Sequence, residues 1–182
     1  MIAPNRFTVI PFPPSDPAAL RLLAALDEYL DTLYSPGACQ RATIQSLEQP
    51  DVAFAVVVDT APLSQSVEPS PAGNAANPVV VACGAVRCSP GSSQAELQRV
   101  FVDPVYRQRG SGRLLVRYLE DQALSRGAKE VVLETGDAQK EAVVMYTRLG
   151  YERCEPVKKV AGCSDGKAGG SAETFWMRKQ FM

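Results

Sequence analysis

The sequence predicts a mixed α/β protein in which one β-sheet carries helices on both faces. Three observations support this class. Apolar runs typical of strands alternate with amphipathic stretches of helical period, and the strands outnumber the helices. The chain has 182 residues, of which 46% are hydrophobic, enough for a proper core. We therefore expect residues 1–182 to form a single domain.

The first part of the chain predicts a strand, two helices and two further strands. The strand Phe7–Phe12 ends in prolines, and Asp16 followed by Pro17 is a helix N-cap with proline at the first helical position. The helix that follows ends near Tyr34 and carries a leucine stripe: Leu20, Leu23, Leu26, Leu30 and Leu33. A shorter helix is expected at 41–48 and strands at 52–60 and 79–88. Residues 61–78, rich in Pro, Ser, Ala and Asn, predict a mobile insertion at the tip of a hairpin.

The second part predicts strands alternating with two helices. Strands are expected at 95–102, 129–135, 151–157 and 173–181, and residues 158–172 form a late polar loop. The first helix follows Gly112, ends near Gly127 as C-cap, and has an apolar face of Leu114, Leu115, Tyr118, Leu119 and Ala123. Its polar residues are expected to point away from that face: Arg113, Arg117, Glu120 and Asp121. The second helix spans about 138–149, with Ala142, Met145, Tyr146 and Leu149 on one face.

Charge and hydropathy exclude several partners. The net charge is −1 and basic residues form no patch, so nucleic acid is not expected as a partner. No apolar run approaches the roughly 18 residues of a membrane span, and the N-terminus lacks a signal-peptide pattern. We expect a cytoplasmic protein without a membrane partner.

The histidine and cysteine content restricts the chemistry. The chain has no histidine, which excludes Ser-His-Asp and Cys-His nucleophilic machinery. The five cysteines are scattered without a C-x-x-C pair, which favours reduced thiols and argues against a metal site; they are Cys39, Cys83, Cys88, Cys154 and Cys163. Proton transfer must use Glu, Asp, Tyr, Lys, Cys or water.

The stretch "VDPVYRQRGSGRLL", residues 102–115, has two interpretations. Gly110 and Gly112 can serve a tight strand-to-helix turn. They can also let an anion approach the free N–H groups at a helix N-terminus, with Arg107 and Arg109 adding positive charge. A dinucleotide fingerprint needs a third glycine where Leu115 stands, and a P-loop lysine is missing, so both of those sites are poorly supported.

Two motifs resemble the GCN5-related N-acetyltransferases. Arg107-x-x-Gly110-x-Gly112, after the strand "RVFVDP", looks like motif A of that family, [QR]-x-x-G-x-[GA]. "LETG" and "EAVVMYTRLGYE" resemble motif B, with matches at Ala142, Tyr146, Gly150 and Tyr151. The resemblance covers residues 96–152, and the order of elements agrees with the family along almost the whole chain.

The resemblance implies acetyl-coenzyme A as co-substrate and no metal. The family's sheet splays between the strands at 95–102 and 129–135, and the acyl arm enters that split. Backbone groups of Val100, Phe101 and Val102 would bind the pantetheine arm. Backbone N–H groups of the glycine stretch would hold the pyrophosphate: Arg107, Gln108, Arg109, Gly110, Ser111, Gly112 and Arg113.

The resemblance also suggests an acid and a base for attack by a neutral amine on the thioester. Tyr146 matches the family's tyrosine beside the sulfur, although its position on an apolar helix face is equally typical of a core residue. Glu96 is a candidate base, and Glu134 or a water chain are alternatives. Many members carry an asparagine that contacts the cofactor before motif B, and here Asp137 or Gln139 stands near that position instead.

The acceptor remains open at this level. We expect a primary amine on a small metabolite, and protein N-termini or peptides are the alternative within the same class. A non-catalytic acyl-CoA sensor and a plain interaction domain are rival classes. The residues that vary most in the family, 16–48 and 158–172, should select the acceptor, and the family suggests a homodimer.

Overall fold

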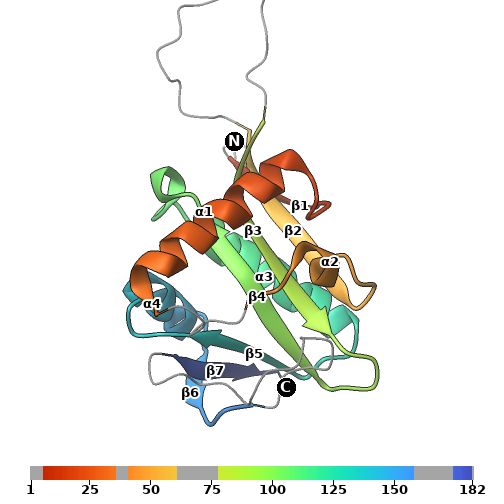
Figure 1. Ribbon diagram of the computed structural model, residues 1–182. Helices are drawn as coiled ribbons and strands as arrows, with labels where there is room; N and C mark the ends of the chain where they lie inside the picture. The colour runs from red at the N-terminus through yellow and green to blue at the C-terminus, as the bar shows by residue number, and fades with distance from the viewer. Residues whose placement is uncertain (1–5, 36–40, 61–77, 158–173, 182) are drawn as a thin grey trace, which may run out of the picture.

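The described part of the chain forms one mixed seven-stranded sheet (Figure 1). The structure is a computed structural model that describes residues 6–35, 41–60, 78–157 and 174–181. The strands are β1 (Phe7–Pro11), β2 (Val52–Asp59), β3 (Val79–Cys88), β4 (Gln94–Val102), β5 (Glu130–Thr135), β6 (Glu152–Cys154) and β7 (Phe175–Gln180). The helices are α1 (Pro17–Leu33), α2 (Ile44–Leu47), the 3₁₀ turn η1 (Pro104–Tyr106), α3 (Ser111–Ser125) and α4 (Lys140–Arg148).

The expected order of strands and α-helices is confirmed, and η1 is an addition inside the stretch 102–115. The helix expected at 41–48 is only one turn, Ile44–Leu47, which Thr43 caps by accepting a hydrogen bond from the N–H of Ser46. The hairpin-tip insertion at 61–78, apart from residue 78, and the late loop at 158–172 lie outside the described residues. No helix in the described ranges is long and apolar enough to cross a membrane.

Helices cover both faces of the sheet, as the sequence predicted. The sheet order is β1-β2-β3-β4-β5-β7-β6, and β4 and β5 are its parallel pair. One core lies under α1 and α2 and includes Leu22, Leu26, Leu47, Phe54 and Phe101. The other lies under α3 and α4 and includes Leu115, Leu119, Val131, Leu133 and Tyr146. Figure 1 shows α1 crossing one face while α3 lies behind the sheet.

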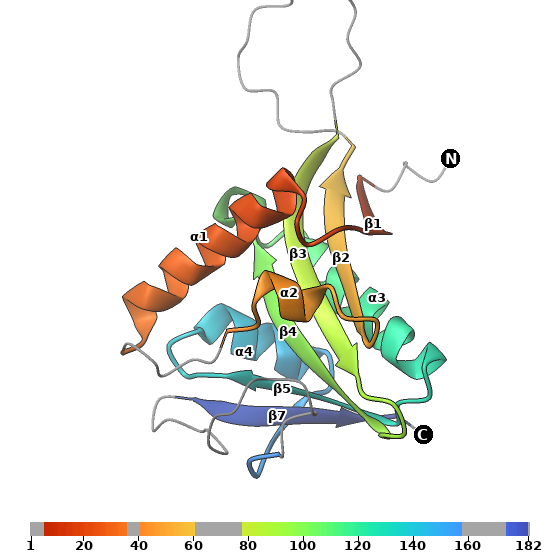
Figure 2. The same ribbon diagram turned by 45° about the vertical axis from the view of Figure 1, so that its right-hand side comes forward.

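The centre of the sheet opens between β4 and β5. The two strands pair only from Gln94 opposite Glu130 to Leu97 opposite Leu133. Beyond these positions β4 continues to Val102 and β5 to Thr135 without pairing with each other, although each still pairs with its other neighbour. Figure 2 shows the two strands diverging from the end where they pair. The carboxyl half of β4 therefore has one edge that no strand of the described chain covers.

Two expectations about buried faces were wrong. Leu20 is 40% exposed, and Leu22 is buried in its place. The rest of the expected stripe faces the sheet, since Leu23 and Leu26 are buried and Leu30 packs against the same core, so only Leu20 lies beyond the border of that face. The N-cap itself is confirmed, since the Asp16 carboxylate accepts a hydrogen bond of 2.8 Å from the N–H of Ala18.

Glu120 does not point away from the core. It is 5% exposed, and its carboxylate accepts hydrogen bonds of 3.0 and 2.9 Å from Lys179 Nζ on β7. Burial, and after it the nearby Glu120 charge, raises the pKa of Tyr151. The sequence of α3 could not show this, because the partner that makes burial of the carboxylate tolerable lies 59 residues away.

Helix α3 lies close to the sheet at Gly84, in the middle of β3. A Cβ at this position would lie 3.1 Å from Leu119 Cδ1, 3.2 Å from Val100 Cγ2 and 3.3 Å from Leu115 Cδ2. All three distances are tighter than ordinary van der Waals contact, so the absence of a side chain sets the distance between helix and sheet.

We expect Gly84→Ala to destabilise the fold by about 1–3 kcal/mol, because the added methyl overpacks the core. The control is Gly91→Asn, where nothing lies within 4 Å and asparagine tolerates the positive φ of 75°. Urea denaturation measures both variants. Equal midpoints for the two would show that α3 can retreat from the sheet at no cost.

Candidate active site

The free edge of β4 leads directly into the glycine stretch. The N–H of Asp103 donates to the carbonyl of Val81 on β3, at 2.9 Å. Because successive residues of a strand alternate in direction, the backbone of Phe101 also faces β3. The backbone groups of Val100 and Val102 therefore point to the opposite edge of β4, where β5 no longer pairs with it. Of the three residues expected to bind an extended ligand, Phe101 has its backbone groups engaged in the sheet.

Arg107 fastens the end of β4 to the surrounding helices. Its Nε donates to the carbonyl of Val102 at 3.2 Å, and its Nη1 lies 3.5 Å from a carboxylate oxygen of Glu141 on α4. Its guanidinium also lies over two aromatic rings, 5.1 Å from the Tyr29 centroid and 5.7 Å from that of Phe101. Its backbone N–H donates to another carbonyl within the turn. Arg107 thus shapes the loop, and its backbone N–H is already engaged within the turn.

The backbone from Gln108 to Arg113 leads into the N-terminus of α3 with several N–H groups unpaired among the described residues. Gln108 and Gly110 have positive φ values of 60° and 88°, and Gly110 is the N-cap of α3 without a capping side chain. The first turn closes with the N–H of Leu114 donating to the carbonyl of Gly110 at 3.0 Å. The N–H groups of residues 108–113 find no acceptor within the described chain. Such unpaired donors at the positive end of a helix dipole suit a phosphate.

The two glycines have different tasks. A Cβ at Gly110 would meet nothing within 4 Å, so space in front of the loop is open and only the backbone angle requires glycine. A Cβ at Gly112 would lie 3.0 Å from Met145 Sδ and 3.2 Å from Val102 Cγ2. Gly112 therefore allows α3 to pack against β4 and α4. The sequence could not separate these roles, because both glycines fit the same motif.

The side chains of residues 108–113 differ in their exposure. Ser111 is buried, and its hydroxyl donates to the carbonyl of Tyr106 at 3.4 Å. Arg109 and Arg113 are exposed, as is Gln108. Both arginines add positive charge near the helix N-terminus, but the direct donors there belong to the backbone.

Tyr146 lies on the buried side of α4. It is 6% exposed, and its ring meets that of Tyr151 edge to face, with centroids 5.6 Å apart. Burial raises the pKa of its hydroxyl, so this hydroxyl is a proton donor throughout the neutral range. The helix ends at Arg148, and Gly150, two residues later, has the left-handed φ of 91° that commonly follows a helix C-terminus. Both interpretations of Tyr146 from sequence, core residue and potential acid, are compatible with this position.

Glu96 lies beside the point at which β4 and β5 separate. It is 5% exposed and stands opposite Val132 on β5 and Arg87 on β3. Its neighbours Ala95 and Leu97 belong to the core under α3 and α4, so Glu96 faces the side of α1 and α2.

Glu134, the alternative base, lies on the same sheet face as Glu96. It is two residues beyond Val132, the β5 residue that stands opposite Glu96. It stands opposite Trp176 of β7, and its carboxylate accepts a hydrogen bond of 2.7 Å from the hydroxyl of Thr174. Because β4 has already left β5 here, Glu134 borders the opening from the far strand, whereas Glu96 borders it at its closed end.

Tyr146 and Glu96 approach the sheet from opposite faces. Tyr146 comes from the side of α3 and α4, and Glu96 points to the side of α1 and α2. Where β4 and β5 pair, the continuous sheet keeps side chains on its two faces apart. Only beyond Leu97 and Leu133, where this pairing stops, can side chains from the two faces contact the same bound ligand.

Gln139 joins three elements at the far end of this opening. Its side-chain oxygen accepts hydrogen bonds from the hydroxyl of Tyr34 at 3.2 Å and from that of Thr135 at 3.3 Å. Tyr34 caps α1, so the end of this helix is tied to the start of α4. Asp137, the other residue near the position of the family's asparagine, pairs with Arg153. The contribution of Tyr34 had no signal in the sequence, because its partners lie 105 residues away.

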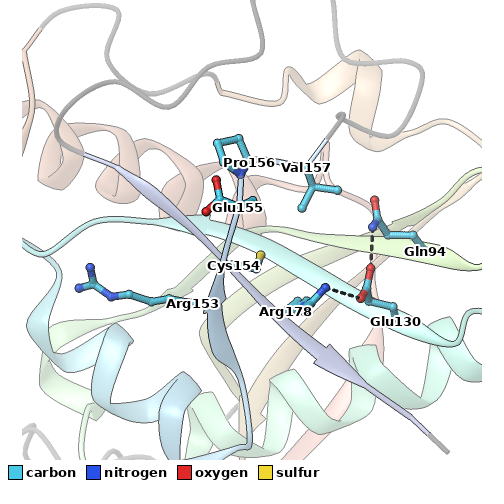
Figure 3. Close-up of a pocket in the computed structure, with 8 residues that line it drawn as sticks. All are labelled: Gln94, Glu130, Arg153, Cys154, Glu155, Pro156, Val157 and Arg178. Atoms are coloured by element: carbon cyan, nitrogen blue, oxygen red, sulfur yellow. Dashed lines mark hydrogen bonds and ion pairs between the residues drawn. The ribbon is translucent and has the colours of Figure 1, made fainter.

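A pocket of about 520 Å³ lies on the same sheet face as Glu96 and Glu134, toward β6 (Figure 3). Gln94, Glu130, Arg153, Cys154, Glu155, Pro156, Val157 and Arg178 line it. Glu130 is held by Gln94 Nε2 at 2.7 Å and lies 3.9 Å from Arg178. Burial raises the pKa of the Cys154 thiol, which is the state of an unreactive cysteine. Within the described residues, no group of three or more Cys, Asp or Glu side chains could hold a metal ion.

Comparison with known proteins gives one consistent family. The sequence profile of the acetyltransferase (GNAT) family matches residues 65–151. A protein of Azospirillum brasilense named IAA acetyltransferase is 29% identical over 138 residues, which cover 76% of this chain and 79% of that protein. Other curated relatives align over shorter segments, which cover between 26% and 50% of their own length.

Solved structures share the fold over nearly the whole chain. A candidate acyl-CoA N-acyltransferase of Klebsiella pneumoniae has a TM-score of 0.66 at 26% identity, covering 97% of this chain and 98% of its own. An aminoglycoside 6′-N-acetyltransferase solved with coenzyme A has a TM-score of 0.63 at 16% identity, covering 96% and 97% of the two chains. The second likeness concerns the fold alone. Sequence motifs, family profile and fold agree, and this chain belongs to the GCN5-related N-acetyltransferase (GNAT) family.

Proposed function

We propose that this N-acetyltransferase moves the acetyl group of acetyl-CoA to a primary amine of a small metabolite, by direct attack in a ternary complex. One observation carries the proposal. The uncovered edge of β4, from Gln98 to Val102, runs directly into the unpaired N–H groups at the start of α3. An extended arm with amide groups and a phosphate at its end matches this sequence of binding groups.

The residues present fit coenzyme A. The N–H groups of residues 108–113 offer donors for a pyrophosphate. Val100 and the N–H of Val102 are available to the amides of the pantetheine arm, whereas the carbonyl of Val102 already accepts from Arg107. We therefore assign Arg107 and Phe101 to shaping the site, and the direct backbone contacts to the remaining residues of the expected set.

Proton transfer falls to two side chains of this chain. Bound acetyl-CoA supplies an activated thioester carbonyl and a thiolate leaving group. Glu96, as carboxylate, accepts a proton from the ammonium form of the acceptor, which frees the amine lone pair for attack. Tyr146 donates its hydroxyl proton toward the departing sulfur and recovers a proton from the second N–H that the nitrogen loses as the amide forms; its raised pKa keeps the donated proton available. Holding both reactants in one opening supplies much of the remaining rate enhancement.

The burial of Glu96 supports a slender acceptor. At 5% exposure, its carboxylate can be approached by the end of a primary amine but not by a bulky substituted one. Glu134 remains the alternative base, because it also faces the side of α1 and α2 and borders the opening. A peptide N-terminus would have to enter by the same route.

The decisive experiment is a thiol-release screen of the full chain with acetyl-CoA. We expect turnover with one class of small amines among amino acids, polyamines and aminoglycosides, and less with peptides that bear a free N-terminus. Higher turnover with peptides would contradict the small-metabolite acceptor and indicate a protein N-terminus instead. Binding of acetyl-CoA without turnover on any amine would favour the sensor alternative, and absence of binding would reject acetyl-CoA as donor.

Tyr146→Phe should lower kcat by about 10²–10⁴-fold while acetyl-CoA still binds, because the ring stays packed against Tyr151 and only the acid is lost. In the wild type, kcat should show no loss from tyrosine ionisation up to about pH 10, since burial raises the pKa of Tyr146 above its ordinary value. Steady-state kinetics from pH 6 to 10 measure both effects. Unchanged kcat in the variant would make Tyr146 a core residue only.

Gly110→Val should weaken acetyl-CoA binding more than Arg109→Ala does. Valine is strained at the φ of 88° and its branches stand in front of the backbone donors, whereas Arg109 contributes only an exposed charge. Gly110→Asn is the matched control, because asparagine adopts positive φ more readily. Isothermal titration with acetyl-CoA gives the ranking. A larger loss of affinity in Arg109→Ala than in Gly110→Val would indicate that side chains, and not backbone N–H groups, make the main phosphate contacts.

A further inference from the structure

Arg99 occupies an unusual backbone position in the middle of β4. Its φ is 55°, a left-handed value that is unfavourable for a residue with a Cβ. The register of β3 and β4 shifts here, so that Arg99 and Val100 stand opposite the single residue Gly84. This is a β-bulge, and it comes two residues after Leu97, the last residue of β4 that pairs with β5. Because bulges bend a strand, this one turns β4 away from β5.

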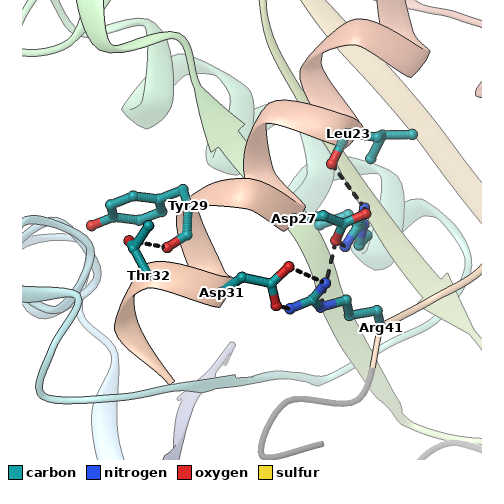
Figure 4. A network of polar contacts seen from close by, with 7 residues as sticks. Leu23, Asp27, Tyr29, Asp31, Thr32 and Arg41 are labelled. Carbon is teal, nitrogen blue, oxygen red and sulfur yellow. Dashed lines mark hydrogen bonds and ion pairs between the residues drawn. The ribbon is translucent and has the colours of Figure 1, made fainter. Parts of the chain in front are cut away.

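The side chain of Arg99 anchors the bulge to α1. It is 7% exposed, and its Nη1 and Nη2 donate to the two carboxylate oxygens of Asp27 at 2.5 and 3.0 Å. Nη2 also donates to the carbonyl of Leu23 at 3.2 Å. Figure 4 shows Leu23 and Asp27 presenting these acceptors from neighbouring turns of α1. The forked geometry fixes orientation as well as distance, which a single charge could not do.

Asp27 also connects this anchor to the segment that follows α1. Arg41 Nε lies 3.6 Å from Asp27, and the same guanidinium pairs with Asp31 one turn further along α1 (Figure 4). The chain of contacts thus runs from the β4 bulge through α1 to the residues that precede α2. These elements cover the sheet face to which Glu96 points.

Stability alone is a poor reason for this arrangement. Arg99 Nε is buried without a hydrogen-bond partner among the described residues, so the desolvation of the guanidinium is incompletely compensated. Apolar side chains of similar volume often replace a buried ion pair without loss of stability. Apolar side chains could not, however, fix the angle between β4 and α1 as the forked ion pair does.

We propose that Arg99 and Asp27 are positioning residues for acetyl transfer. Their ion pair holds the bulge that sets where β4 leaves β5, and it ties the acetyl-CoA edge of β4 to the helix on the acceptor side. The inference rests on the proposed function for its catalytic consequence. Neither residue would touch the reacting atoms, because each acts through the backbone of β4.

The test compares Arg99→Met, Asp27→Asn, the double variant and Arg99→Lys with a matched control. Arg6 forms a similar forked pair with Asp59, between 2.7 and 3.1 Å, at the β1 end of the sheet, so Arg6→Met removes an equivalent interaction far from the opening. The first readout is amide hydrogen exchange at Phe101 and Asp103, whose backbone groups face β3. The second is isothermal titration with acetyl-CoA.

We expect both single variants to accelerate exchange at these amides and to weaken acetyl-CoA binding by about tenfold, with the double variant no worse than either because the residues act as a unit. Arg99→Lys should recover part of the affinity, since it keeps the charge but not the forked donor geometry. Arg6→Met should change neither readout, whatever its effect on melting temperature.

Exchange rates in Arg99→Met equal to those of the wild type would overturn the anchoring of the bulge, independently of any ligand. Faster exchange with unchanged acetyl-CoA affinity would overturn the positioning role. A wild-type protein that does not bind acetyl-CoA would instead overturn the proposed function, and the exchange data would still report on the bulge. Arg99→Gly adds a check, because glycine accepts the φ of 55° without strain: if it binds acetyl-CoA as tightly as the wild type, the backbone alone holds the bulge.

Discussion

The separation of β4 from β5 is the constraint on which the rest of this structure depends. A paired sheet would keep Tyr146 and Glu96 on opposite sides of a continuous layer of backbone. Because pairing stops after Leu97 and Leu133, backbone donors of β4 remain free and the two faces communicate. An enzyme of this kind needs its donor and acceptor to approach from different directions, and the interrupted pairing provides both routes with one structural feature.

Several neighbouring elements hold this opening in shape. Arg107 secures the end of β4 through the carbonyl of Val102 and lies over the rings of Tyr29 and Phe101. Gln139 joins the end of α1 to the start of α4. Helix α3 is pressed against the sheet where Gly84 and Gly112 lack side chains. The free N–H groups at the start of α3 are therefore held in place by packing of its first turns and not by a capping side chain.

Family membership and acceptor identity rest on different parts of the molecule. The family is visible in the glycine stretch, in the α4 segment around Tyr146 and in the fold shared with solved N-acetyltransferases. We propose that the acceptor is selected on the face of α1 and α2, where Glu96 and Glu134 lie. The polar pocket around Glu130 and Arg178 extends that face toward β6, so charged groups line the sheet beyond the proposed base.

The sequence by itself determined the order of elements, the N-cap at Asp16 and the residues of both motifs, because these signals are local. It also suggested Tyr146 and Glu96 without testing their roles. It misjudged Leu20 and Glu120, since their exposure depends on how a helix is rotated against its partner and on Lys179 of a distant strand. Only the tertiary structure decided the tasks of Gly110 and Gly112 and the anchoring of Arg99 by Asp27. Such contacts join residues far apart in the chain, and no local pattern encodes the geometry that brings them together.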